Sequence, residues 1–129
     1  MFARRITAVS VISAVLVVGA ATAAFAATGN GTNLGVGSSS CVGPDLVENQ
    51  TVLETGSAFK TGTMTGASAK WSIWASASSN FNTATSVAGA TAKTIDQFYV
   101  PPANQAEYVW GCIYNNNTVA IDYSIAINP

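Results

Sequence analysis

Apolar side chains alternate with polar or small ones along residues 119–127, and this alternation is the strongest constraint on how the chain can fold. Successive side chains of a β-strand point to opposite faces of a sheet, so a period of two predicts a strand with one buried face. Residues 107–114 alternate in the same way. The intervening residues 115–118 read Asn-Asn-Asn-Thr, and asparagine tolerates the left-handed backbone of tight turns. We therefore expect the two runs to form a β-hairpin.

The rest of the chain carries shorter strand-like segments, separated by clusters of Gly, Ser and Asn. These segments lie at 46–54, 58–65, 69–77, 86–92 and 95–100. Pro101 and Pro102 cannot donate ladder hydrogen bonds, so they end the last of them. No segment carries the apolar stripe of an amphipathic helix. About seven short strands with frequent turns predict an all-β, jelly-roll-like antiparallel β-sandwich.

Residues 1–26 have the order of regions that is typical of a secretory signal peptide. A short basic start is followed by an uncharged apolar run at 6–24 and by a small-x-small site that ends at Ala26. We expect cleavage after Ala26 and a secreted protein, either extracellular or associated with the cell envelope. The alternative is an uncleaved membrane anchor, because residues 6–27 are long enough to span a bilayer. Contact with a membrane is expected only in that case.

Cleavage after Ala26 would leave three lysines and six acidic residues, a net charge of −3. The three lysines are Lys60, Lys70 and Lys93. So few cations cannot neutralise a run of phosphates, which argues against nucleic acid as a partner. The same shortage argues against docking on anionic membranes. We expect any partner to be neutral or to be bound through polar and aromatic contacts.

The two cysteines, Cys41 and Cys112, both lie in the part of the chain that would be exported. An even number of cysteines in an exported protein predicts a structural disulfide. Residues 28–40 are mostly Gly, Ser, Thr and Asn and show no apolar periodicity. We therefore expect a flexible arm at 27–43, followed by a single β-sandwich domain at 44–129.

The composition excludes several kinds of catalysis. The chain has no histidine, which excludes nucleophile–histidine triads and zinc sites built on imidazole. A disulfide would also remove both thiols as nucleophiles or metal ligands. The carboxylates show neither an identifiable catalytic pair nor a calcium-loop pattern and are interpreted as surface charge. A calcium ion held by scattered loop carboxylates stays open. We expect no catalytic residue, no cofactor and no metal site.

The tryptophans and tyrosines are the candidates for ligand binding. On a strand, Trp71 shares a face with Ile73 and is expected in the core, whereas Trp74 falls on the polar face with Lys70. A tryptophan among polar residues on an exported sheet can stack on a sugar ring or anchor a protein partner. The candidate ligand-binding residues are Trp74, Tyr99 and Lys70. The alternative for Trp74 is that a second sheet or a loop covers it.

A row of aromatic residues shares its strand face with one of the cysteines. The row comprises Tyr108, Trp110, Cys112 and Tyr114. Because a disulfide normally lies inside a small domain, we expect this row to be core that packs on the disulfide. If Cys41 instead reached the row from a loop, the row would form a surface platform.

Three segments resemble the end of bacterial pre-peptidase C-terminal-type β-sandwich modules. They lie at 95–102, 106–110 and 122–125, within a likeness that covers about residues 60–127 and consists mostly of strand alternation and turn placement. Those modules are secreted, non-catalytic accessory domains with a jelly-roll-like fold. Residues 105–108 read Gln-Ala-Glu-Tyr where that family has Gly-x-Tyr-Tyr. The resemblance implies a secreted accessory domain of bacterial type, and no functional residue is transferred from it.

These features predict a secreted, non-catalytic binding module that recognises an extracellular carbohydrate or protein through surface aromatics. One alternative is a cell-envelope protein that assembles through its strands, because Asp122 is the only charge that opposes edge pairing along residues 119–127. Another alternative is a small pore-forming or inhibitory toxin in which residues 56–94 form a membrane hairpin.

Overall fold

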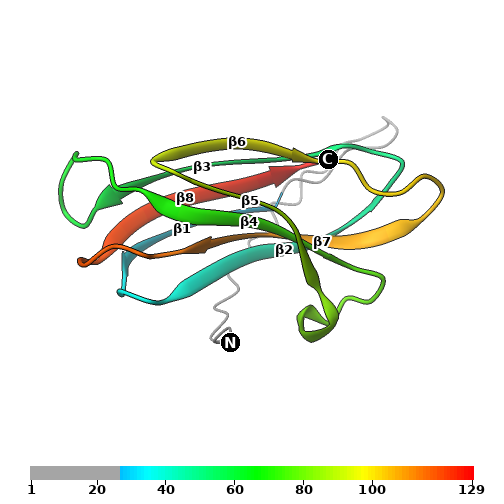
Figure 1. Cartoon of the computed structure of the whole chain (residues 1–129), viewed down its shortest axis with the longest axis horizontal. Coiled ribbons are helices and arrows are strands. Elements are labelled where there is room, and N and C mark those ends of the chain that lie inside the picture. The colour runs from blue at the N-terminus through cyan, green and yellow to red at the C-terminus, as the bar shows by residue number, and fades with distance from the viewer. Residues whose placement is uncertain (1–26) are drawn as a thin grey trace, which may run out of the picture.

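The structure, a computed structural model, describes residues 27–129, so the predicted signal segment at 1–26 lies outside the described residues. The described part contains eight β-strands, one short 3₁₀-helix and no α-helix. The strands are β1 (Ala27–Leu34), β2 (Ser39–Glu48), β3 (Val52–Lys60), β4 (Ala69–Ser76), β5 (Thr85–Ala92), β6 (Thr94–Tyr99), β7 (Ala106–Tyr114) and β8 (Ile121–Asn128), and the 3₁₀-helix is η1 (Phe81–Thr83) (Figure 1).

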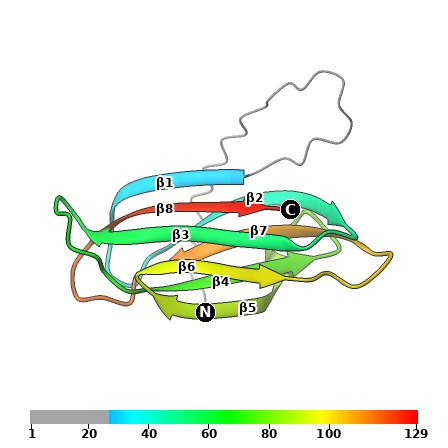
Figure 2. The same ribbon diagram turned by 90° about the horizontal axis from the view of Figure 1, so that it is seen from above.

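The strands form two four-stranded antiparallel sheets that pack face to face. Their orders are β1-β8-β3-β6 and β2-β7-β4-β5. Figure 2 shows the first sheet in front, with the strands of the second running behind it. Consecutive strands lie in different sheets at every connection except β4 to β5, which is the winding of a jelly roll. The predicted all-β sandwich is therefore confirmed, with eight strands instead of about seven.

The expected flexible arm at 27–43 is wrong, because these residues form β1 and the first half of β2. Strand β1 pairs with β8 from its first residue onward. Gly31 in this strand leaves room for a neighbouring side chain. A Cβ on Gly31 would lie 2.7 Å from the Tyr123 ring, whose hydroxyl is hydrogen-bonded to Ser40 Oγ at 2.6 Å. The glycine is therefore needed for close packing of the ring on the strand.

The expected hairpin between the two alternating runs is also wrong, because β7 and β8 belong to different sheets. Residues 115–120 instead carry the chain from one sheet to the other. Asn115 is fully buried in this connection, where its Nδ2 donates to the carbonyls of Leu34 and Val119, each at 2.9 Å. Its Oδ1 accepts from the Asn117 amide at 2.8 Å. Asparagine at this position satisfies the backbone of a crossover and does not form a tight turn.

The main core lies between the sheets and is built from large apolar side chains. Its largest fully buried members are Trp71, Ile73, Ile113, Ile121 and Ile127. The core position predicted for Trp71 is thus confirmed, and its Nε1 donates to the Ala92 carbonyl at 2.9 Å. A Cβ on Gly56 would lie 2.5 Å from the Trp71 ring, so glycine at this position makes room for the indole.

A carboxylic acid, Glu54, is fully buried in the same core. Gln97 Nε2 donates to its Oε1 at 2.5 Å, while Oε2 is buried without a hydrogen-bond partner among the described residues. Gly111 provides the space, since a Cβ there would lie 3.0 Å from that Oε2. Burial raises the pKa of Glu54 to about 8, although hydrogen bonds from the Gln97 side chain and the Cys112 amide oppose the shift. Glu54 is therefore mostly protonated at neutral pH.

This buried acid predicts a protein that becomes less stable as the pH rises. The pKa of Glu54 is higher in the folded chain than the ordinary 4.5, so the stabilisation is complete below pH 4.5 and is lost as the pH passes about 8. We expect the urea midpoint to fall between about pH 6.5 and about pH 9. Glu54→Gln, which stays neutral, should flatten this dependence and raise the midpoint at the alkaline end. Glu48→Gln on the exposed end of β2 should keep the wild-type profile; a wild-type midpoint that does not change with pH would contradict the prediction.

Candidate ligand-binding groove

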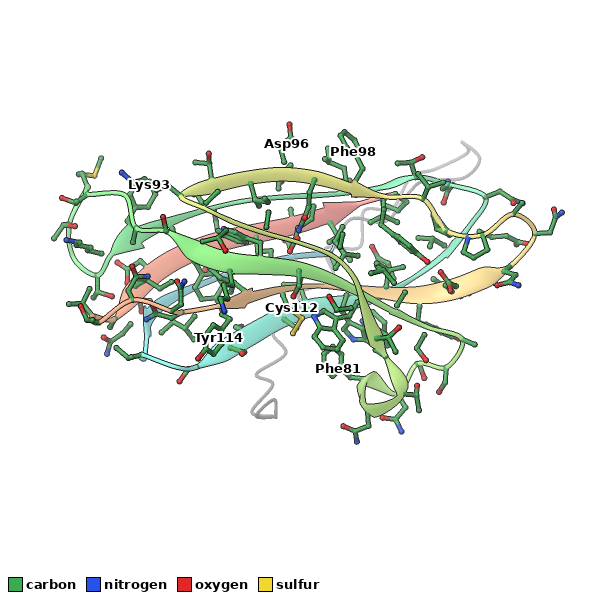
Figure 3. The ribbon with its side chains drawn as sticks, viewed as in Figure 1. Phe81, Lys93, Asp96, Phe98, Cys112 and Tyr114 are labelled. Atoms are coloured by element: carbon green, nitrogen blue, oxygen red, sulfur yellow. A yellow bond between two sulfur atoms is a disulfide. The ribbon has the colours of Figure 1, made fainter. Side chains whose placement is uncertain are left out.

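The outer face of the β2-β7-β4-β5 sheet carries the predicted aromatic row. On β7, the side chains that face the core belong to Val109 and Ile113, so the alternate positions face outward. The row is therefore not part of the core between the sheets. Trp110 and Cys112 are nevertheless buried and pack with the disulfide in a second cluster, as expected, whereas Tyr114 is exposed. Figure 3 shows Cys112, Tyr114 and Phe81 on one side of the molecule and Asp96 and Phe98 on the opposite side.

The disulfide predicted between Cys41 and Cys112 is present, with an S–S distance of 2.01 Å. It joins directly paired residues of the neighbouring strands β2 and β7, so it lies within one sheet instead of bridging two. Both cysteines are almost completely buried, together with Trp110, although they lie on the outer face. Something other than the opposite sheet must therefore cover them.

The cover is the connection between β4 and β5, which contains η1. The Phe81 ring packs edge-on against Trp110, with 5.2 Å between the ring centroids and 86° between the planes. It also contacts Trp74 at 5.4 Å. Ser76 Oγ and Thr83 Oγ1 are hydrogen-bonded at 2.5 Å, and Asn80 caps η1 by accepting from the Asn82 amide. The loop thus forms a second, smaller apolar cluster outside the sandwich.

The part of this face that the loop leaves open is hollowed into a groove. Strand register aligns Cys112, Ser72 and Gly89 in one row across β7, β4 and β5. These three residues have small side chains or none, so the surface of the sheet is recessed along this row and forms the floor of the groove. The groove has a volume of about 370 Å³. It is lined by Ser39, Lys70, Trp71, Ser72, Trp74, Gly89, Ala90, Thr91, Cys112, Ile113 and Tyr114.

Aromatic rings close the two ends of the groove. At one end, Trp74 is half-buried, and its Nε1 donates to Ser72 Oγ at 2.7 Å. At the other end, Tyr114 pairs with Lys70, whose Nζ lies 5.8 Å from the centre of the tyrosine ring, within range of a cation–π contact. Lys70 and Trp74 are four residues apart on β4, so the two ends are separated by about 13 Å.

Two of the three predicted ligand-binding residues, Trp74 and Lys70, therefore line one groove. The third, Tyr99, does not join them, because it lies at the end of β6 in the other sheet and packs against the main core. Its hydroxyl donates to Glu107 Oε1 at 2.6 Å, and burial together with this carboxylate raises the pKa of Tyr99 to about 12. The contacts of Tyr99 are thus those of a structural residue.

Sequence reasoning missed the groove residues Ser72, Gly89 and Thr91. Serine and threonine are among the commonest residues of this chain, so nothing in the sequence distinguishes these two. Gly89 lies in a Gly-, Ala- and Thr-rich segment that carries no strong periodicity. Its place next to Ser72 depends on the register between β4 and β5, which local sequence does not determine.

The chain matches no family model, and neither a curated protein nor a solved structure matches it. The resemblance to pre-peptidase C-terminal-type modules stays a prediction. Among residues 27–129, no group of three or more Cys, Asp or Glu side chains is arranged to hold a metal ion. Within the same residues, no helix is sufficiently long and apolar to cross a membrane.

Removing the ring that covers Trp110 should destabilise the protein and expose the indole. Phe81→Ala should lower the free energy of unfolding by about 1–2 kcal/mol, since the ring is half-buried and makes two aromatic contacts. Urea unfolding measures the loss, and acrylamide quenching of tryptophan fluorescence should increase. Phe98→Ala makes the same chemical change at a side chain that is 60 % exposed, and it should cost less than about 0.5 kcal/mol. Equal losses in the two variants would contradict the role of Phe81.

Proposed function

We propose that this protein is a secreted, non-catalytic binding module whose outer-face groove recognises a neutral carbohydrate. The observation that carries the proposal is a groove whose floor is built from small groups and whose two ends are formed by Trp74 and by Tyr114 with Lys70. Binding sites for small molecules combine apolar and aromatic walls with a few polar groups, and their volumes begin at about 300 Å³.

The chemistry of the lining supports a sugar over other ligands. Indole and phenol rings stack on the apolar faces of pyranose rings, while hydroxyl groups match the donors and acceptors at the sugar edge. Ser39, Ser72, Thr91 and Tyr114 contribute hydroxyls to the lining. Lys70 is the one charged residue that lines the groove, and no carboxylate does. Such a lining favours a neutral ligand that has many hydroxyl groups.

Secretion belongs to the same proposal and is supported by two observations. The disulfide indicates a non-reducing environment. Residues 1–26 carry the sequence pattern of a signal peptide. A protein ligand remains the second occupant to test, because the surface tryptophan would also suit it.

The two alternative functions lose the observations on which they depended. Residues 121–128 form β8, which lies between β1 and β3 and is not an edge strand that could pair with another chain. Residues 56–94 contribute to β3, β4, β5 and β6, which are divided between the two sheets. Neither assembly through this strand nor a hairpin from this span is proposed further.

Changes in the groove should abolish retention on glycans without unfolding the protein. A Cβ on Gly89 would meet only the Trp71 carbonyl oxygen, at an ordinary 3.4 Å, so Gly89→Leu fills the groove without a backbone clash. We expect Trp74→Ala to weaken binding at least about fivefold on a glycan array, since a stacking contact is worth roughly 1 kcal/mol or more. Gly89→Leu should weaken it at least as much, because its side chain would occupy the groove. Tyr114→Ala should weaken it as well.

Phe98→Ala is the matched control, because it removes an exposed aromatic ring from the opposite side of the molecule and should leave retention unchanged. Urea midpoints establish that each variant is folded. Full retention by Gly89→Leu would refute the groove as the binding site. Retention of an envelope protein, with no glycan bound, would refute the carbohydrate and favour the protein ligand.

A further inference from the structure

Strand β1 is tightly packed from its first residue. The Ala27 side chain is only 6 % exposed, and the residue pairs directly with Ile127 of β8. The backbone N–H of Ala27 does not point into solvent either, because it donates a hydrogen bond to the Asp45 carboxylate of β2. The backbone nitrogen that follows the predicted cleavage site therefore lies against an acidic side chain.

The position of Asp45 depends on an irregularity in β2. The register of β2 against β7 shifts between Val42 and Asp45. Gly43 has a φ of +116°, and a Cβ there would lie 2.7 Å from the Val109 carbonyl oxygen, so the shift requires glycine. After the shift, Asp45 is opposite Val109, whose side chain is fully buried in the core. The carboxylate is thereby turned inward, toward the start of β1.

The hydrogen bond from Ala27 does not satisfy Asp45. Although the residue as a whole is half-buried, its Oδ2 atom is buried and has no hydrogen-bond partner among residues 27–129. Burial raises the pKa of Asp45 to about 6, and the Ala27 amide opposes the shift only in part. A single neutral N–H leaves a buried carboxylate oxygen without compensation, which is costly.

We propose that cleavage between Ala26 and Ala27 creates the missing partner, so that the new α-ammonium group of Ala27 forms an ion pair with Asp45. A peptidase that acts on the exported precursor hydrolyses the peptide bond with one water molecule. Ala26 leaves with a carboxylate, and the released amine of Ala27 takes up a proton. The nitrogen then carries three N–H donors and a positive charge where the precursor has one neutral donor.

The ion pair would also join the two sheets at one end of the sandwich. Strand β1 is the edge of its sheet and contacts β2 of the other sheet beside it. An ammonium group bound to Asp45 would fix the first residue of β1 to β2 and so join the two sheets at this end. Cleavage at any other peptide bond would not place the α-ammonium group on Ala27 beside Asp45. The site thus distinguishes one mature N-terminus from its neighbours.

The test begins with protein exported from the full-length precursor. Mass spectrometry should give a mature chain that starts at Ala27, and the pKa of its α-amino group should lie above the usual 7.7–8.0, because Asp45 stabilises the charged form. The α-amino group is then acetylated at mildly acidic pH, where lysines remain protonated. Acetylation should lower the urea midpoint of the wild-type protein and should change the midpoint of Asp45→Asn much less.

Glu48→Gln, an exposed acid on the same strand, is the control and should respond to acetylation as the wild type does. Equal effects of acetylation in the wild type and in Asp45→Asn would overturn the proposal. A mature chain that starts at another residue would overturn it too. If Asp45→Asn does not fold, the proposal is tested by the pKa of the α-amino group in the wild-type protein. A value within the usual 7.7–8.0 would refute the ion pair.

Discussion

Strand β7 packs on both of its faces, and the rest of the structure depends on this. Val109 and Ile113 on one face complete the core between the sheets. Trp110 and Cys112 on the other face support the disulfide and the cover formed by η1. Strand β7 lies between β2 and β4, and because its outer face is also apolar it needs a second apolar layer outside the sandwich. The groove forms where that outer layer ends.

The sequence predicts strands and faces far better than it predicts their partners. A period of two correctly separates Trp71 from Trp74, but it cannot say which face of a strand meets the opposite sheet when both faces carry large apolar groups. That ambiguity explains why the aromatic row on β7 packs with the disulfide on the outer face and not between the sheets. The hairpin expected between β7 and β8 fails for a related reason, because pairing across the sandwich is a long-range property that local sequence does not encode.

Glycine is the residue whose meaning changes most between sequence and structure. A Gly-rich segment reads as a flexible linker, yet Gly31, Gly56 and Gly111 each lie where a neighbouring side chain occupies the space of a missing Cβ. Gly89 differs, because the space beside it is open and belongs to the groove. Composition cannot separate these roles, since the distinction depends on what lies opposite. Of the three candidate binding residues, only Trp74 and Lys70 lie in the same groove.

The order β1-β8-β3-β6 places β8 between β1 and β3, although β8 follows both of them by more than sixty residues of sequence. Strand β1 consequently has no neighbour within its own sheet until β8 has been synthesised, and β3 lacks one of its two neighbours for the same time. A nascent chain with this winding cannot close its sandwich early. Under the proposed secretion, the sandwich could close only after residues 121–128 have also crossed the membrane.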